Sequence, residues 1–295
     1  MEKTAMIAIV GRPNVGKSTL TNTLVGEKIA IVTNKPQTTR TRIFGVVNRG
    51  ETQLVLTDTP GFHKPRTRLG DYMVDVVHQS VTDTDAAVLL VEPVASVGTQ
   101  ETLLLEQIRQ AHVPVILAVN KIDTVPKERI LEVIAAYSAL QEYEAVIPVS
   151  GKTGDGVEDL LAELDKFAAE GPHLFPEGMT TDQPERQIMA EIVREKLLLC
   201  LEKEIPHGTA VEVTRFSERD SGIIDLDVTI FCEKQSHKGI IIGKHGVMLK
   251  KIGEMARADA EAFMGTKISL HTWVKVKENW RDSDALIRNF GFTRE

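Results

Sequence analysis

The sequence is poor in cysteine and contains no long apolar run. Only two of its 295 residues are cysteines, Cys200 and Cys232, and both lie among apolar neighbours. Such cysteines are typical of reduced, packed thiols, so neither a disulfide framework nor a zinc site is expected. No apolar run approaches the roughly 18 to 20 residues that cross a bilayer, and no secretory leader pattern is present. We therefore expect a cytoplasmic protein.

Charge is distributed unevenly along the chain. Residues 1–183 contain 17 basic and 24 acidic side chains, which accounts for the whole net charge of −7, and the remaining 18 basic and 18 acidic side chains cancel. Residues 234–253 contain no acid but include five lysines: Lys234, Lys238, Lys244, Lys250 and Lys251. A local positive field of this kind can bind phosphate groups even on an acidic protein.

The first part of the chain alternates short apolar runs with longer segments of helical periodicity, which is typical of a parallel sheet covered by helices. Buried strands are expected at residues 6–10, 86–91, 115–119 and 146–149. Residues 43–48 and 52–57 flank a short polar turn and predict a hairpin, so one strand at the sheet edge should be antiparallel. We predict an α/β domain with a mixed, mostly parallel sheet over residues 1–170.

Proline and glycine are concentrated between residues 171 and 184, which predicts a linker. Residues 185–295 then predict a smaller α+β domain in the order helix, strand, strand, helix, strand. Its helices are expected at 185–203 and 247–264, and its strands at 209–214, 223–233 and 268–276.

A phosphate-binding loop is predicted where the first apolar strand ends and a helix begins near Thr19. The loop fits G-x-x-x-x-G-K-S and consists of Gly11, Arg12, Pro13, Asn14, Val15, Gly16, Lys17 and Ser18. Its glycines let backbone N–H groups surround phosphates at the helix N-terminus, while Lys17 reaches the β- and γ-phosphates and Ser18 ligates Mg²⁺. A simple glycine turn would not explain the motifs that follow.

The second motif, Asp58-Thr59-Pro60-Gly61, ends a later strand. Ligands of open α/β sheets bind at the carboxyl ends of strands, so this motif should face the phosphate loop. Asp58 is then expected to hold Mg²⁺, and the Gly61 amide to contact the γ-phosphate.

The third motif, Asn120-Lys121-Ile122-Asp123, selects the base. The Asp123 carboxylate accepts hydrogen bonds from the N1–H and exocyclic amine of guanine, which adenine does not offer. Asp123 as a simple helix cap would leave Asn120 and Lys121 unexplained.

With these motifs the first domain resembles the Era family of Ras-like P-loop GTPases. The resemblance implies that Ser150, Gly151 and Lys152 belong to the loop that covers guanine O6. It also implies that residues 36–42 form switch I, in which Thr39 closes on Mg²⁺ and the γ-phosphate, and that residues 61–70 form switch II.

Phe62 stands where a Ras-type enzyme carries the glutamine that positions water. A phenyl ring cannot hold water, so slow intrinsic hydrolysis is expected. In related GTPases with asparagine at the position of Asn14, K⁺ binds beside the phosphates in place of an arginine finger; the alternative is a turn residue selected for its backbone. The predicted catalytic residues are thus Lys17, Thr39, Gly61 and Asn14.

A second ligand site is predicted in the smaller domain. Gly243-Lys244-His245-Gly246 matches the G-x-x-G loop of KH (K homology) domains, which clamps about four nucleotides of single-stranded nucleic acid. Charge would come from Lys244, His245, Lys250 and Lys251, and an apolar groove for bases from Ile240, Ile241 and Ile242. The order of elements around the loop resembles a type II KH domain.

A Ras-like domain followed by such a module is the architecture of the Era family. The resemblance implies GTP or GDP with Mg²⁺ as ligands, binding to the 3′ region of small-subunit ribosomal RNA, and a role in small-subunit assembly. It further implies peripheral association with the inner membrane; we expect a monomer and no DNA partner. Two alternatives stay open: an RNA-binding protein that the nucleotide only stabilises, and a GTPase that couples cell-cycle or membrane events through a different partner.

Overall fold

The computed structural model describes residues 1–292, which form two compact units. The first unit comprises residues 1–65 and 70–182, and the second comprises residues 66–69 and the chain from 183 onward. Within residues 1–292 no helix is long and apolar enough to cross a membrane. Both cysteines are free thiols.

The first unit is built on a mixed sheet with the strand order β2-β3-β1-β4-β5-β6. Its pairings are parallel except for β2 with β3 and for the short β7 with β1, which confirms the expected mixed, mostly parallel sheet. The strands are β1 (Lys3–Val10), β2 (Ile43–Arg49), β3 (Thr52–Asp58), β4 (Ala86–Val91), β5 (Val115–Val119), β6 (Ala145–Pro148) and β7 (Ala169–Glu170).

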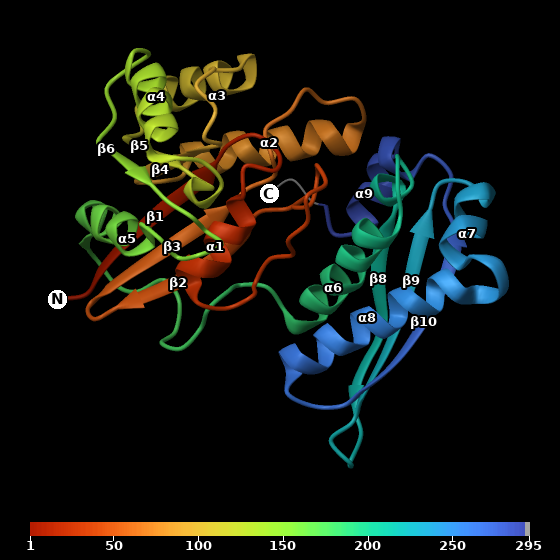
Figure 1. Ribbon diagram of the computed structural model, residues 1–295. Helices are drawn as coiled ribbons and strands as arrows, with labels where there is room; N and C mark the ends of the chain where they lie inside the picture. Colours follow the sequence, from red (N-terminus) through yellow and green to blue (C-terminus); the bar gives the residue numbers. More distant parts are fainter. Residues whose placement is uncertain (293–295) are drawn as a thin grey trace. The chain divides into compact units, whose positions relative to one another are not determined.

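Helices cover both faces of this sheet (Figure 1). One face packs against α1 (Lys17–Val25) and α5 (Val157–Leu164), and the other against α2 (Arg68–Thr82), α3 (Thr99–Gln110) and α4 (Lys127–Ser138). Successive side chains of a strand point to opposite faces, so Ile7 and Ile9 of β1 face α1 and α5, whereas Ala8 and Val10 face the other helices. With both faces covered, the carboxyl ends of the strands are left to bind a ligand.

The segment predicted as a linker packs on the first unit over much of its length. The Gln53 side chain, fully buried in β3, donates to the carbonyl of Phe175 (2.9 Å) and accepts from the N–H of Leu174 (2.8 Å). At the neighbouring edge, the N–H of Val46 donates to the carbonyl of Thr180 (2.8 Å). An edge strand presents unpaired backbone groups, and this segment satisfies some of them, so residues 171–182 join the first unit despite their proline and glycine content.

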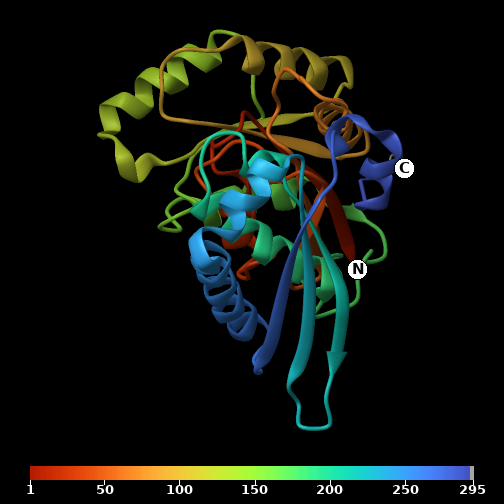
Figure 2. The same ribbon diagram turned by 90° about the vertical axis from the view of Figure 1, so that its right-hand side faces the viewer.

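The second unit is a three-stranded sheet with helices α6, α7 and α8 packed against it (Figures 1 and 2). β8 pairs with β9 in antiparallel fashion, whereas β9 and β10 are parallel. The elements are α6 (Glu185–Cys200), β8 (Ala210–Glu218), β9 (Ile224–Cys232), α7 (Gln235–Ile242), α8 (Val247–Met264), β10 (Ile268–Val276) and α9 (Asp284–Asn289). A parallel pair needs a crossover, and α7 with α8 supplies it.

Helix α7 corrects the expected order of elements, which placed no helix between β9 and the glycine loop. The three consecutive isoleucines at 240–242 and Gly239 are weak helix formers, so local propensity hides this helix. Tertiary packing overrides the propensity, because the Ile241 side chain is fully buried in the core of the unit.

Candidate nucleotide and RNA sites

The phosphate loop connects β1 to α1 and depends on two glycines. Gly11 has φ 155° and Gly16 has φ 98°, both in the region that favours glycine. A Cβ atom at Gly11 would lie 2.4 Å from the Leu90 carbonyl oxygen, and one at Gly16 would lie 2.4 Å from Asn120 Nδ2. The loop therefore fits against β4 and the base-selecting loop only with glycine at both positions.

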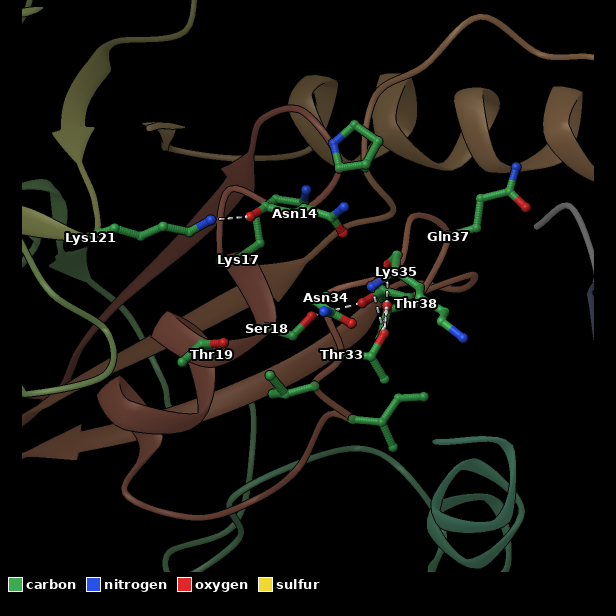
Figure 3. A pocket seen from close by; sticks show the side chains of 16 residues that line it. Asn14, Lys17, Ser18, Thr19, Thr33, Asn34, Lys35, Gln37, Thr38 and Lys121 are labelled. Carbon is green, nitrogen blue, oxygen red and sulfur yellow. Dashed lines mark hydrogen bonds between the residues drawn. The ribbon is translucent and has the colours of Figure 1, made fainter. Parts of the chain in front are cut away.

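A cavity of about 270 Å³ opens beside this loop (Figure 3). It is lined by Pro13, Asn14, Gly16, Lys17, Ser18, Thr19, Gly61, Lys121 and by residues 31–35 and 37–39. The cavity thus brings together predicted residues from all three motifs and from switch I.

Lys17 is a buried cation at the start of α1. Its Nζ donates to the carbonyls of Gly11 (3.0 Å) and Arg12 (2.9 Å). Burial lowers the pKa of Lys17 to about 8, and the charge of Asp58 opposes this shift. A buried ammonium next to a helix N-terminus is well suited to an anion such as phosphate.

Ser18, Thr39 and Asp58 converge at one point of the site. Ser18 Oγ donates to Asp58 Oδ2 (2.7 Å), and Thr39 Oγ1 lies 2.8 Å from Ser18 Oγ and 3.4 Å from Asp58 Oδ2. Asp58 Oδ1 is buried and has no hydrogen-bond partner within residues 1–292. Two hydroxyls and a carboxylate with one unpaired oxygen form an all-oxygen donor set, which fits Mg²⁺.

Switch I presents Thr39, not Thr38, to this cluster. Thr38 Oγ1 instead donates to the Lys35 carbonyl (2.7 Å) and lies 2.7 Å from Thr33 Oγ1, which shapes the preceding turn. The Thr39 side chain is buried against the carboxylate. Of the two threonines, Thr39 is therefore the one that lies beside Ser18 and Asp58.

Asp58 should destabilise the metal-free protein above about pH 6. Burial raises the pKa of Asp58 to about 6 from an ordinary 3.8, so the folded state binds this proton more tightly than the unfolded state. The favourable contribution is present at low pH and is lost as pH rises from about 4 to 6. Asp58→Asn, which cannot ionise, should therefore gain about 2 kcal/mol in unfolding free energy over wild type between pH 4 and pH 7.

Urea unfolding of nucleotide-free protein with a metal chelator measures this difference. Asp159→Asn, at an exposed position of α5, serves as the control for the substitution itself. A constant difference between Asp58→Asn and wild type at both pH values would contradict the prediction.

The base-selecting loop is joined to the phosphate loop by one buried amide. Asn120 Nδ2 donates to the Val15 carbonyl (2.8 Å), and Asn120 Oδ1 accepts from the N–H of Gly151 (3.0 Å). Ser150 Oγ donates to Asp123 Oδ1 (2.7 Å) and so orients the carboxylate. Lys152 is exposed. The structure therefore brings the predicted base residues together around Asn120.

Five residues predicted to contact the nucleotide direct their side chains elsewhere, and one of them, Val15, is fully buried in the core that faces α1 and α5. Arg12 pairs with Glu101 of α3, Thr59 Oγ1 donates to the Ile9 carbonyl (2.8 Å), and Phe62 packs in the core between β4 and α2. Pro60 is buried as well and does not line the cavity. Their motif positions fix the backbone at the edge of the sheet, whereas their side chains fill neighbouring space.

His63 and Gln37 link the two switches and were not expected from the motifs. His63 Nδ1 lies 2.8 Å from the Gly61 carbonyl oxygen, and its Nε2 lies 3.3 Å from Gln37 Nε2. No sequence pattern pointed to this pair, because the contact depends on how the loops fold over the site.

The Gly243–Gly246 loop joins α7 to α8. Gly243 has φ 74° and Gly246 has φ 79°, and a Cβ atom at Gly243 would lie 2.8 Å from Met248 Cβ. Lys244 and His245 between them are exposed, as are Lys250 and Lys251 on α8. The loop therefore presents its charged side chains at the N-terminal end of α8, where backbone N–H groups are available to phosphate.

The groove beside this loop differs from the expected one. Ile241 is fully buried and Ile242 packs against the core, so of the three isoleucines only Ile240 is exposed. A hollow of about 440 Å³ lies instead between α8 and β10, where it is lined by Gly246, Leu249, Lys250, Gly253, Glu254, Arg257, Leu270 and Thr272. The apolar stripe of α7 is used to hold the crossover against the sheet.

The fold and these sites define a Ras-like P-loop GTPase domain followed by a KH domain. Profiles of two families match, one described as "50S ribosome-binding GTPase" over residues 6–121 and one as "KH domain" over residues 204–281. GTPase Era of Ruminiclostridium cellulolyticum is 50% identical over 290 residues, which covers 98% of this chain and 97% of the relative. The chain belongs to the Era family of GTPases.

Other relatives and solved structures agree along the whole chain. GTPase Era of Caldanaerobacter subterraneus is 45% identical over 291 residues, with 98% of each chain covered. A crystal structure of Era in complex with MgGDPNP and nucleotides 1506–1542 of 16S ribosomal RNA matches with TM-score 0.95 and 35% identity over 100% of both chains. A point variant of Aquifex aeolicus Era bound to GDP.AlF4⁻ matches with TM-score 0.94 and 36% identity over 99% of this chain and 100% of that one.

Proposed function

We propose that this protein binds GTP with Mg²⁺, hydrolyses it to GDP and phosphate, and grips the 3′ region of 16S ribosomal RNA during assembly of the small ribosomal subunit. The observation that carries the proposal is the convergence of Ser18, Thr39 and Asp58 beside the buried Lys17, in a chain that also has an exposed G-x-x-G loop. Era structures with MgGDPNP and with GDP.AlF4⁻ support the nucleotide and the metal.

Each group of the nucleotide site has a distinct role in this proposal. Ser18, Thr39 and Asp58 would hold Mg²⁺, which supplies charge neutralisation for the β- and γ-phosphates. Lys17 and the N–H groups at the start of α1 stabilise the charge that develops on the transferred phosphoryl group. The Gly61 N–H would contact the γ-phosphate; a Cβ at this position would lie 2.6 Å from Pro13 Cα, so only glycine lets the backbone approach the phosphate loop so closely.

Base selection rests on Asp123, oriented by Ser150, while Asn120 ties the base loop to the phosphate loop. Lys121, Gly151 and Lys152 complete the base side, and the backbone of the motif residues completes the phosphate side.

Hydrolysis is expected to be slow, because Phe62 is buried and no glutamine follows Gly61.

We assign K⁺ to the site as an activating ion held by Asn14, whose exposed carboxamide borders the cavity. Its left-handed φ of 67° also suits the alternative role of a turn residue. GTP turnover should therefore be at least several-fold faster in KCl than in NaCl, and Asn14→Asp should change this ratio. Equal turnover in the two salts would indicate that Asn14 acts only as a turn residue.

The RNA part of the proposal follows the 16S complex of the relative and the KH match, whereas the description of the GTPase family profile mentions the 50S subunit. The proposal follows the 16S complex because that structure aligns with the whole chain, whereas the profile that mentions the 50S subunit covers only residues 6–121. Binding would use Gly243 to Gly246, Lys250, Lys251 and the exposed Ile240.

The decisive experiment compares GTPase rates with and without an RNA of nucleotides 1506–1542, together with RNA affinity in the GTP- and GDP-bound states. Stimulation by the RNA and nucleotide-dependent affinity are expected.

A Lys17→Ala variant that binds and releases RNA like wild type and supports ribosome assembly would favour an RNA-binding protein whose nucleotide only stabilises the fold. Crosslinking in cells that recovers no ribosomal RNA with the protein would favour a different partner.

We further propose that the protein is a cytoplasmic monomer that associates peripherally with the membrane. Flotation with lipid vesicles tests the membrane association.

A further inference from the structure

Four charged side chains form a network behind the phosphate loop. Arg12 of the loop pairs through Nε with Glu101 of α3, and its Nη2 lies 3.6 Å from Glu92 Oε2. The other Glu92 oxygen accepts from Lys121 Nζ (2.6 Å). Lys121 also donates to the carbonyl of Asn14 (2.6 Å; Figure 3). Glu92 thus bridges a cation of the phosphate loop and a cation of the base-selecting loop.

The carboxylates of this network belong to parts of the chain that no motif covers. Glu92 directly follows β4, and Glu101 lies in the first turn of α3. Glu101 is only 2% exposed, and Arg12 supplies its positive partner. Gly98 leaves room for it, since a Cβ atom there would lie 2.6 Å from Glu101 Oε2. A buried carboxylate with so few partners is costly unless its cation stays in place, so Arg12 is held toward α3.

The loops joined by the network have conformations that need outside support. Asn14 and Lys121 have φ of 67° and 62°, a left-handed backbone that asparagine tolerates and that lysine rarely adopts. The hydrogen bond between them therefore connects the turn at Asn14 to a locally strained position at Lys121. Such positions persist when the surrounding contacts over-determine them. The Glu92 bridge is a contact of this kind: Glu92 itself does not line the phosphate cavity, whereas its partner Lys121 does.

We propose that Glu92 and Glu101 are positioning residues for nucleotide retention, because they hold Arg12 and Lys121 and thereby fix the phosphate loop against the guanine-selecting loop. This inference rests on the proposed nucleotide site. Loss of the bridge should let the two loops separate more often and release nucleotide faster. The chemical step should be spared, since both carboxylates lie away from Ser18, Thr39 and Asp58.

The experiment compares Glu92→Gln, Glu101→Gln and wild type by stopped-flow dissociation of a fluorescent GDP with Mg²⁺. Glu92 is partly exposed and its replacement by Gln keeps the shape, so this variant should fold. Release should be about three- to tenfold faster for Glu92→Gln, as expected for a partly exposed charge network, while kcat at saturating GTP stays within about twofold. Glu106→Gln, an exposed position of the same helix as Glu101, is the matched control and should release GDP like wild type.

A second comparison separates positioning from general loosening. Lys121→Met should accelerate release by itself, and adding Glu92→Gln to it should have little further effect if Glu92 acts through Lys121. Unchanged release in Glu92→Gln, or fully additive effects in the double variant, would overturn the inference while leaving the proposed function intact. Wild-type protein that does not retain guanine nucleotide would overturn both. Lower unfolding midpoints without faster release would show a structural role only.

Discussion

Asp123→Asn is expected to change the preferred base from guanine to xanthine. The Asp123 carboxylate can accept from N1–H and from the exocyclic amine of guanine, and Ser150 holds it in position. The amide of asparagine offers a donor in place of one acceptor, which clashes with the amine of guanine but matches the O2 carbonyl of xanthine. GTP affinity should fall by about a hundredfold or more, because the mismatch leaves the polar groups of the base contact unpaired.

Displacement of a fluorescent GDP from the site by GTP, ATP or xanthosine triphosphate measures this change in affinity. Asp159→Asn carries the same substitution on the exposed face of α5 and should keep the wild-type order of affinities. Hydrolysis of xanthosine triphosphate by Asp123→Asn should approach the wild-type rate with GTP, since Lys17 and the metal cluster are untouched. A uniform loss of affinity for all three nucleotides would mean that Asp123 supports the loop but does not read the base.

Charge reversal in the G-x-x-G loop should remove RNA binding and leave the GTPase intact. Lys244→Asp with His245→Asp places two carboxylates between Gly243 and Gly246, at the point where phosphates would approach the start of α8. Both side chains are exposed, so the fold should tolerate the change. Affinity for the RNA of nucleotides 1506–1542 should fall about a hundredfold at ~0.1 M salt, and the salt dependence of binding should become shallower.

The matched control is Ser221→Asp with Lys267→Asp. Ser221 lies at the exposed turn between β8 and β9, and Lys267 precedes β10 at the other end of α8. Counting neutral His245, each double variant makes the net charge more negative by three, so a general charge effect would act equally on both. Filter binding with the same RNA provides the measurement. Equal losses of affinity would place RNA recognition outside the loop.

The nucleotide site was largely predictable because short, contiguous motifs at strand ends supply its residues. Lys17, Ser18 and Asp58 follow from the turn and the strand that carry them; Lys17 and Ser18 line the cavity, and Asp58 accepts a hydrogen bond from Ser18. The partner of Arg12 could not be predicted, since Glu101 is 89 residues away in sequence and meets it only because α3 packs beside the loop. Contacts of this kind depend on tertiary packing, so a local sequence pattern does not predict them.

The second unit shows the same division between local and tertiary information. Residues 247–264 have a clear helical stripe and were identified correctly, as were both parallel strands. Helix α7 was missed because its sequence favours a strand, and only the burial of Ile241 reveals why it forms a helix. That error also misplaced the groove, which lies between α8 and β10.

The crossover that carries the Gly243–Gly246 loop has a consequence for binding kinetics. The loop joins α7 to α8, and both helices pack against the sheet of this unit, so the two ends of the loop are fixed once the unit has folded. Much of its conformational entropy is therefore lost during folding and not during encounter with a ligand. RNA should meet a preorganised loop, and association should be limited by diffusion and by the RNA's own flexibility, with little contribution from rearrangement of the protein.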